Sequence, residues 1–404
     1  MPRSCFTTES HGRLRAQVRE FAEAEVAPRV AHMEATRGVE RDLVRAIARR
    51  GWIAVTVGPE YGGMRRGQRG GHLAKTIIVE ELSRVSGAIG AAVQASQLGV
   101  AKIVHFGSAE QRMRWLPPIA AGDVLPTIAV TEKESGSHVL GMTGTAARDG
   151  DEYVLTGTKV FVGNSHIGDL HGVVARTGPG EQDLSAFLVE GDRPGVTLGP
   201  HTEAIGLRGF SFGEVRLEEC RVPAANLLGR KGDGLAVAYS SSTLYGRPNL
   251  TAVALGIHQA VVEQTAVYAK ETTRYGESLS RLPTIRQALG RMQSRLMTAR
   301  LAAYHAVHLL DTGARCDYEL MNAKLINTEM LLDSARDGME VHAACGLFAD
   351  RPIERYLRDA YHLYAPAGTS DVQRLRLSEL ALGQPKGREW SEQLADRIGG
   401  SGTR

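Results

Sequence analysis

The spacing of apolar residues divides the chain into three zones. From about residue 10 to residue 121, apolar residues recur every three or four positions, as in RAQVREFAEAEVAP and RDLVRAIARRGW, which predicts helices. From about residue 125 to residue 229, short runs rich in β-branched residues, such as YVLTGTKVFVG and GEVRLEECRVP, are separated by turn sequences such as RDGDE. From about residue 233 to residue 382 the helical spacing returns in longer segments, with a sustained apolar face between Ile285 and Leu310.

These zones predict an α+β protein of three domains and a tail. We expect an N-terminal helical domain over residues 1–124, a small antiparallel β-barrel or sandwich over 125–229, a C-terminal helical bundle over 230–385 and a tail over 386–404. The last helix should begin near Ser370, which has the spacing of a capping box with Gln373, and it should stop at Gly383 and Pro385.

Length, charge and cysteine usage exclude several classes of protein. The chain has 404 residues and a net charge of +3, which is too small to indicate a nucleic-acid partner. Its densest basic cluster, Arg65 to Arg69 in GGMRRGQRGG, is interpreted as a solvated loop. The four cysteines form no Cys-x-x-Cys pair and the N-terminus lacks an apolar signal segment, so we expect a cytoplasmic protein. The longest apolar run, SGAIGAAVQASQLGVAKIV, is interrupted by Gln94, Gln97 and Lys102 and predicts a buried helix rather than a membrane span.

Three patterns that can carry chemistry fail on their context. GFSFG matches a nucleophile elbow centred on Ser211, but a strand pattern follows where the elbow requires a helix, so an ordinary β-turn is favoured. LGRKGDGLA, which begins at Leu228, offers glycines before a helix but lacks the βαβ context of a phosphate cradle. The 13 histidines include no His-x-x-x-His pair, so no metal site is predicted.

Two segments at the start of the β domain have the chemistry of a ligand site. AVTEKESGSH follows a predicted strand with Thr131, Gly136 and Ser137, and such a loop exposes hydroxyls and backbone N–H groups that suit an anionic or carbonyl-rich ligand. GTKVFVGNS places the aromatic Phe161 beside the small Gly163, which offers a flat face. Two ordinary β-turns remain an alternative interpretation of these segments.

The chain resembles the acyl-CoA dehydrogenase family over nearly its whole length. In chain order, AVTEKESGSH is similar to the family's flavin-binding loop, GTKVFVGNSHIGDL to its second flavin strand, GLRGFSFGEVRLEECRVPAANLLG to its G-x-R…V-P…N-x-L-G stretch, YGRPNLTAVALG to its R-x-x-x-A-x-x-x-G helix, and YLRDAYHLYAPAGTSDVQR to its R-D…E-G-T-S-E segment. The resemblance implies an N-terminal helical domain, a central small β-barrel domain and a C-terminal four-helix bundle, in an FAD-containing homodimer or homotetramer. The family's usual reaction is the α,β-desaturation of an acyl thioester, with FAD taking the β-hydride.

The resemblance also implies roles for individual residues. The substrate would contact Ser137, Tyr245 and Arg247, of which Arg247 matches the family's active-site arginine. The backbone N–H of Ala367 would form the oxyanion hole for the thioester together with a flavin hydroxyl. The FAD cofactor would lie against residues of several segments: Ile128, Val130, Thr131, Gly136, Ser137, Phe161, Gly163, Arg274, Tyr275, His342 and Thr369.

The departures from the family concern the catalytic base and the residues that hold FAD. Ala367 stands where the catalytic glutamate is expected, and Gly246 stands at the other position that some members use for their base. A positioned base is typically worth about 10²–10⁴-fold in rate, so ordinary desaturation should be slow. The candidates for a replacement base are Asp371, Tyr364, His362 and Tyr245. Among the residues that hold FAD, the replacements are Gly163 for a threonine, Thr272 for the pyrophosphate arginine, with Arg274 nearby, and Pro283 and His342 for glutamines.

Three hypotheses about function follow. The first is a flavin-dependent oxidoreductase with altered chemistry on an acyl thioester of coenzyme A or of an acyl carrier protein, with an electron acceptor or a reductase as its partner. The second is a catalytically silent subunit of a mixed dehydrogenase oligomer, because both the base and FAD contacts are lost. The third is a monooxygenase that uses reduced flavin from a partner reductase, because an oxygenating site does not need the carboxylate base. No membrane partner is expected.

Overall fold

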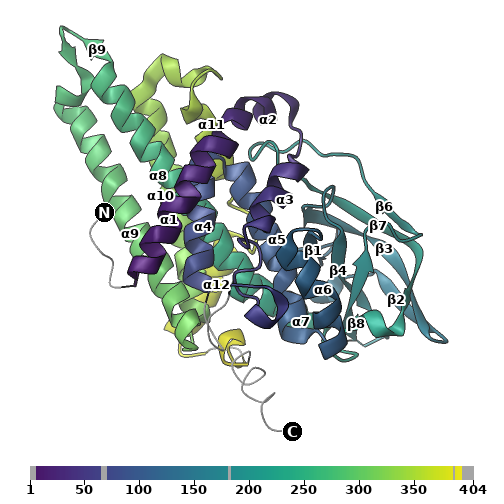
Figure 1. The fold of residues 1–404 in the computed structure, drawn as a ribbon. Helices are drawn as coiled ribbons and strands as arrows, with labels where there is room; N and C mark the ends of the chain where they lie inside the picture. Colours follow the sequence, from purple (N-terminus) through teal and green to yellow (C-terminus); the bar gives the residue numbers. More distant parts are fainter. Residues whose placement is uncertain (1–5, 65–70, 181–182, 385–386, 394–404) are drawn as a thin grey trace.

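The computed structural model describes residues 6–64, 71–180, 183–384 and 387–393 of the chain. An N-terminal group of helices, a β-sheet and a C-terminal group of longer helices follow one another, with the sheet at one end of the molecule (Figure 1). The basic cluster from Arg65 to Arg69, Pro385 and most of the predicted tail lie outside the described residues.

The N-terminal helices include one helix, α5 (Gly87–Phe106), that is buried along most of its length. The helices are α1 (Glu9–Phe21), α2 (Val30–Thr36), α3 (Arg41–Arg49), α4 (His72–Val85), α5 (Gly87–Phe106) and α6 (Ala109–Ala121). Helix α5 is rich in alanine and glycine, and these small residues let neighbouring backbone approach it closely. A Cβ on Gly99 would lie 2.4 Å from the carbonyl carbon of Pro126, so glycine allows the first strand to pack on α5. The apolar run that contains Gln94 is therefore a buried helix, as its sequence predicts.

The β domain is one eight-stranded sheet with the order β6-β7-β3-β2-β4-β5-β8, and β1 pairs with β4 beside this path. Most neighbours are antiparallel, but β4 pairs in parallel with both β1 and β2, so the prediction of a purely antiparallel sheet is wrong at these two pairs. The chain reaches β4 from β2 through β3, which allows a parallel neighbour. The strands are β1 (Pro126–Ala129), β2 (Thr145–Asp149), β3 (Glu152–Gly163), β4 (Leu170–Arg176), β5 (Leu184–Glu190), β6 (Val196–Leu198), β7 (Phe212–Pro223) and β8 (Leu227–Leu228).

Long helices form the C-terminal bundle. Helix α8 packs against α4, α9, α10 and α11, so the bundle shares its core with the N-terminal helices. A small hairpin of β9 and β10 joins α8 to α9 and lies at the tip of the bundle, far from the eight-stranded sheet (Figure 1). The elements are α7 (Gly234–Ser241), α8 (Arg247–Glu271), β9 (Thr273–Arg274), β10 (Glu277–Ser278), α9 (Pro283–Thr312), α10 (Asp317–His342), α11 (Pro352–His362) and α12 (Ser370–Ala381).

The start of α12 differs from the predicted capping box. The N-cap is Thr369, whose hydroxyl accepts a hydrogen bond from the N–H of Val372 at 3.4 Å, while Ser370 is already helical and fully buried. The amide of Gln373 turns the other way and donates to the carbonyls of Ala367 and Gly368. Because Gln373 holds the preceding loop, its side chain is not available to close a capping box.

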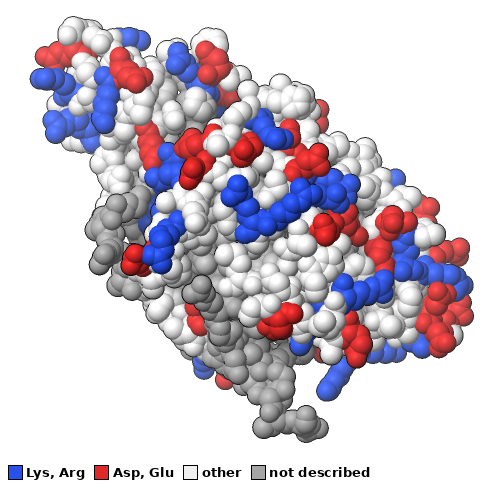
Figure 2. Space-filling model, in the orientation of Figure 1, with Lys and Arg blue, Asp and Glu red and all other residues white. Residues whose placement is uncertain are grey.

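Charged side chains of both signs alternate over the visible surface, as Figure 2 shows, without a large field of one sign. Within the described ranges, no helix is both long enough and apolar enough to cross a lipid bilayer.

Candidate active site

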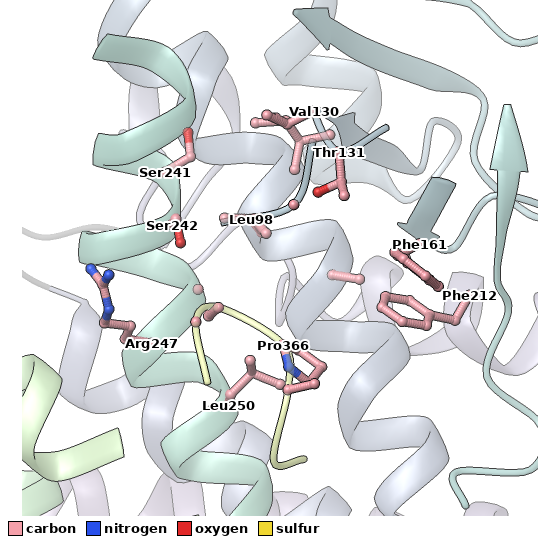
Figure 3. A pocket seen from close by; sticks show the side chains of 18 of the residues that line it. Leu98, Val130, Thr131, Phe161, Phe212, Ser241, Ser242, Arg247, Leu250 and Pro366 are labelled. Carbon is pink, nitrogen blue, oxygen red and sulfur yellow. The ribbon is translucent and has the colours of Figure 1, made fainter. Parts of the chain in front are cut away.

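A cavity of about 480 Å³ lies between the β domain, α5 and the C-terminal helices (Figure 3). Its walls come from the segment after β1, the end of β3, one face of α5, the start of α8 and the loop between α11 and α12. Segments that are more than two hundred residues apart in the sequence therefore meet here, and they include most of the residues that the resemblance assigns to a site.

A buried ion pair holds the loop after β1. Nζ of Lys159 lies 2.7 Å from Oε1 of Glu132, and the N–H groups of Thr143 and Gly144 also donate to this carboxylate. Desolvation raises the pKa of the Glu132 carboxyl, but the Lys159 charge and the hydrogen bonds outweigh it and hold the pKa below its usual value. The preceding residue, Thr131, is thereby fixed at the cavity wall, where its carbonyl accepts from the N–H of Val160 at 2.8 Å.

Phe161 presents an aromatic ring to the cavity. The ladder between β3 and β7 shifts register between Lys159 and Val162, and Phe161 within this bulge has a φ of 55°. Its side chain is 61% exposed, and its ring stacks on Phe212 with 5.6 Å between centroids (Figure 3). The bulge thus turns a large apolar side chain outward, where a flat ligand can cover it.

Gly163 is required by packing on its other side. A Cβ at this position would lie 3.0 Å from the Cβ of Ala95 and 3.1 Å from the ring of Phe210, so a larger residue would force both to move. The close approach of α5 and Phe210 thus favours a residue without a side chain at position 163.

The two positions at which the resemblance places a base lie together on the helical side. Gly246 ends a π-helical stretch from Ser242 to Gly246 that leads into α8. A Cβ built on Gly246 would lie 3.5 Å from the Cβ of Ala367, which is ordinary contact distance. No aspartate, glutamate, lysine or cysteine is among the described residues that line the cavity.

Hydrogen bonds from α10 and α12 fix the loop that carries Ala367. Nζ of Lys324 donates to the carbonyls of Tyr364 and Gly368 at 2.9 Å each, and the Gln373 amide donates to the carbonyl of Ala367 at 3.0 Å. Ala367 has a φ of 56°, a left-handed conformation that costs a non-glycine residue about 1 kcal/mol. Its own N–H donates to no acceptor in the part of the chain that the structure describes. The loop therefore offers a rigidly held backbone donor to the cavity.

Arg247 is a buried cation in the cavity wall. Its Nη1 donates to the hydroxyl of Thr243, and it forms no ion pair with the described carboxylates. Desolvation lowers the pKa of its guanidinium to about 10, so the group still carries its charge at neutral pH.

The structure brings ten predicted site residues to the cavity. Ser137 and Arg247, both assigned to the substrate, are among them. The full set is Ile128, Val130, Thr131, Gly136, Ser137, Phe161, Gly163, Arg247, Ala367 and Thr369.

Two other predicted active-site residues lie outside the cavity wall. Tyr245 is buried, its hydroxyl lies 2.7 Å from Nε2 of His105, and it does not line the cavity. Asp371 points to solvent with a side chain that is 81% exposed and is paired with Arg374 at 3.1 Å. These positions oppose the predicted roles of Tyr245 in substrate contact and of Asp371 in catalysis.

Three residues assigned to FAD also lie elsewhere in this chain. Arg274 and Tyr275 belong to the hairpin at the tip of the bundle, and Tyr275 is 96% exposed. His342 is buried at the end of α10, where its ring stacks on Tyr268 at 4.1 Å between centroids. None of the three lines the described cavity.

Of the four candidates for a replacement base, His362 is the one that lines the cavity. Burial lowers the pKa of its imidazole, although a hydrogen bond to the Gly206 backbone opposes this shift, so the ring is neutral at pH 7. The ring packs against Phe212 at 5.5 Å between centroids. Tyr364, by contrast, is 41% exposed and is not among the residues that line the cavity.

Four polar residues that were not predicted as site residues also line the cavity: Gln94, Tyr239, Ser241 and Ser242. For Gln94 a signal was present, because it is a polar residue in the middle of an otherwise apolar helix. The serines carry no such signal, since serines are common near helix ends. Ser211, the centre of the false elbow, is buried before β7, and its hydroxyl accepts from the N–H of His166.

Comparison with known proteins identifies the family. Three sequence models match the chain: the N-terminal domain of acyl-CoA dehydrogenase over residues 8–123, the middle domain over 127–220 and the C-terminal domain over 232–382. An acyl-CoA dehydrogenase of Bacillus subtilis (strain 168) is 34% identical over 380 residues, which cover 93% of this chain and 99% of that protein.

Two solved structures share the fold. A glutaryl-coenzyme A dehydrogenase in complex with glutaryl-CoA has a TM-score of 0.91 at 26% identity, covering 96% of this chain and 99% of that one. An acyl-CoA dehydrogenase of Bacillus anthracis in complex with FAD has a TM-score of 0.87 at 27% identity, covering 94% of this chain and 67% of that one. The chain therefore belongs to the acyl-CoA dehydrogenase family, which confirms the predicted fold and the predicted class, an FAD-dependent oxidoreductase of acyl thioesters.

Proposed function

We propose that this member of the acyl-CoA dehydrogenase family binds FAD and an acyl thioester in the cavity but transfers the substrate proton without a carboxylate of its own. One observation carries the proposal. The cavity gathers the residues assigned to flavin and a free backbone N–H at Ala367, while Ala367 and Gly246 leave both base positions without an ionisable group.

The residues of the β side fit a flavin. The Phe161 ring is exposed to the cavity and offers an apolar face to a planar ring system. The hydroxyl of Thr131 forms no hydrogen bond within the described residues, so it is available to a polar edge of the cofactor. When bound, FAD would supply the hydride acceptor. We therefore assign Ile128, Val130, Thr131, Gly136, Ser137, Phe161 and Thr369 to its site.

The thioester carbonyl would bind at the N–H of Ala367. Lys324 and Gln373 hold the carbonyls on either side of this N–H, so the donor needs no rearrangement to meet an oxyanion. A preorganised donor of this kind stabilises the enolate that forms when the α-proton leaves. Under this proposal, the site still binds the thioester and still lowers the pKa of its α-carbon, although the glutamate side chain is absent.

His362 is the group we assign to proton transfer. It is a neutral imidazole in the cavity wall, and the hydrogen bond to the Gly206 backbone leaves one ring nitrogen with a free lone pair. In the proposed step the α-carbon–hydrogen bond breaks, the proton goes to this nitrogen, and the electron pair enters the thioester enolate. FAD, when bound, would accept the β-hydride, and the electron pair of the enolate would then form the α,β double bond.

The partners follow from the same proposal. The acyl carrier is coenzyme A or an acyl carrier protein, and a separate electron acceptor or reductase must exchange electrons with the cofactor. Arg274 and Tyr275 contact FAD only if a second copy of the chain brings its hairpin to this cavity, which would make the active form a homodimer or homotetramer.

Absorbance of the purified protein before and after FAD addition is the first test. A flavin band near about 450 nm in stoichiometric amount is expected. If excess FAD leaves the protein colourless, the proposal fails and a silent subunit in a mixed oligomer becomes the better account. If only reduced flavin binds, and oxygen then gives a hydroxylated product, the protein is a monooxygenase.

Exchange of the substrate's α-proton tests the base. Butyryl-CoA incubated with the flavin-loaded protein in D₂O should lose its α-protons, as followed by NMR. His362→Gln should slow this exchange by about 10²-fold or more, whereas Tyr364→Phe, two residues further along the chain but outside the cavity wall, should not. Equal exchange in both variants would remove His362 from the mechanism.

A further inference from the structure

Three buried polar atoms in the cavity wall have no hydrogen-bond partner. They are Oε1 of Gln94, Oγ of Ser241 and Nε of Arg247, and each belongs to a side chain that is at least nine-tenths buried. Ser241 and Arg247 belong to the helical wall that also carries Gly246 (Figure 3). Gln94 comes from α5 and lies on a different wall, so it needs a separate explanation.

Gln94 is a polar residue on an otherwise apolar face. Ala91, Ala95 and Leu98 line the cavity from the same face of α5, and Leu250 faces it from α8. The backbone carbonyl of Gln94 accepts from the Asn249 side chain at 3.1 Å, which places the residue at the contact of α5 with α8. The Gln94 amide is thus the polar feature of the alanine- and leucine-lined part of the cavity.

The side chains of two other buried glutamines donate hydrogen bonds to backbone carbonyls, and Gln94 does not. Nε2 of Gln97, one turn further along α5, donates to the carbonyl of Trp52 at 2.9 Å. Nε2 of Gln111 donates to two backbone carbonyls, those of Ala225 and Leu227. Oε1 of Gln94 has no hydrogen-bond partner, as is also true of Oε1 of Gln97, but Nε2 of Gln94, unlike that of Gln97, donates to no acceptor in the described part of the protein. An amide left unpaired at both ends is destabilising. A ligand that pairs with it would remove this cost.

We propose that Gln94 selects acyl thioesters whose acyl chain carries a hydroxyl group, and this inference rests on the proposed function. A primary amide both accepts and donates, and a hydroxyl group does the same, so the two can pair in either orientation of the amide. The small side chains of the alanines beside Gln94 leave room for an acyl chain. An acyl chain without a polar substituent would leave the Gln94 amide unpaired, whereas one with a hydroxyl group could pair with it. A site built to pair with a substrate hydroxyl discriminates strongly against the analogue that lacks it.

Isothermal titration of the flavin-loaded protein with matched ligands tests the inference. The probes are unsubstituted acyl-CoA and ω-hydroxyacyl-CoA thioesters with four, six and eight carbons, because the hydroxyl must reach the amide. For one chain length we expect the hydroxylated ligand to bind at least about 10-fold more tightly. Gln94→Met, which keeps the volume and removes the polar group, should abolish this preference, whereas Gln287→Met on the exposed face of α9 should keep it.

The outcomes separate the two proposals. If no thioester binds, the proposed function itself fails. If both ligand series bind equally well to the natural protein, the function stands and the role of Gln94 is overturned. Unliganded Gln94→Met should also have a higher unfolding midpoint than the natural protein, since it removes an unpaired buried amide; a lower midpoint would mean that Gln94 has a structural partner and would overturn the inference.

Discussion

The β side and the helical side of the cavity differ in how many of the family's functional side chains they retain. The β side retains the loop around Thr131 and an aromatic face at Phe161, both held by buried interactions such as the Lys159–Glu132 pair. The helical side keeps the shape of its loop, with Lys324 and Gln373 bound to its carbonyls, but its side chains Ala367 and Gly246 carry no acid or base. Under the proposed function, the flavin contacts therefore come mainly from the β side, whereas the helical side offers the backbone donor of Ala367 but no carboxylate.

The loop on the helical side is nevertheless well ordered by hydrogen bonds. Ala367 holds a left-handed conformation, and the buried ammonium of Lys324 donates to two carbonyls of the loop. The loop's geometry is maintained by buried hydrogen bonds although its acid–base side chain is absent. This is the pattern expected when the backbone donor still serves binding.

Restoring a carboxylate should give the largest effect. Ala367→Glu should raise the rate of anaerobic flavin bleaching by butyryl-CoA about 10²–10⁴-fold, because a positioned base is worth that much. Ala367 lines the cavity, and its neighbour Gly246 has no side chain that would occupy the adjoining space. Ala367→Gln is the matched control, since it adds the same volume without a base. Equal rates for the two variants would place the chemistry elsewhere.

Removing the aromatic face tests the other side. Phe161→Ala should weaken FAD binding about 10-fold, because the exposed ring loses its contact with the cofactor. Phe348→Ala, which removes a ring that is 64% exposed outside the cavity, serves as the control. Fluorescence titration with FAD measures both. Unchanged affinity in Phe161→Ala would break the assignment of the β side to flavin.

The buried lysine beneath the loop should reveal itself in the pH dependence of stability. Burial, with help from the Arg247 charge, lowers the pKa of Lys324 from the ordinary lysine value of 10.5 to about 8 in the folded protein. Between these values the unfolded chain binds more protons, so Lys324 makes the free energy of unfolding rise with pH across this window.

Lys324→Met should lack this increment. The stability difference between natural protein and variant should change by about 1–3 kcal/mol between pH 8 and pH 10.5, as measured by urea unfolding. The exposed Lys270 provides the control variant Lys270→Met. Parallel curves for natural protein and Lys324→Met would mean that the ammonium is not buried beneath the loop.

The smallest effect is expected at Asp371. Asp371→Asn should leave flavin bleaching unchanged and alter the free energy of unfolding by less than about 0.5 kcal/mol, because the side chain is solvated and its pair with Arg374 is exposed. A tenfold loss of rate would instead place Asp371 on the helical side of the active cavity.

The motifs predicted the β side better than the helical side. A turn that binds a ligand through backbone and small side chains is local in sequence, so Thr131, Gly136 and Ser137 were found together. On the helical side, the phase of a helix decides which way a side chain points. Asp371 follows the buried Ser370 by one residue and so faces solvent, and spacing alone did not reveal where α12 begins.

The lengths of α8 and α9 explain why the predicted FAD contacts Arg274 and Tyr275 lie outside the cavity of the same chain. Helices α8 and α9 have 25 and 30 residues, and at about 1.5 Å per residue they carry Arg274 and Tyr275 far from the cavity of the same chain. No local sequence pattern predicts the distance between the hairpin and the cavity. The position of the hairpin relative to the sheet is a property of how the bundle packs.

The sequence by itself determined the order of helical, β and helical zones, the loops assigned to flavin and the absence of an ionisable side chain at residues 246 and 367, because apolar period, turn chemistry and residue identity are local. The tertiary structure alone decided that His362 and Gln94 face one cavity while Tyr245 and Asp371 do not, and that Gly246 lies against Ala367. These facts depend on burial and on contacts between residues far apart in the chain, which the packing of α5, α8 and the 364–369 loop creates.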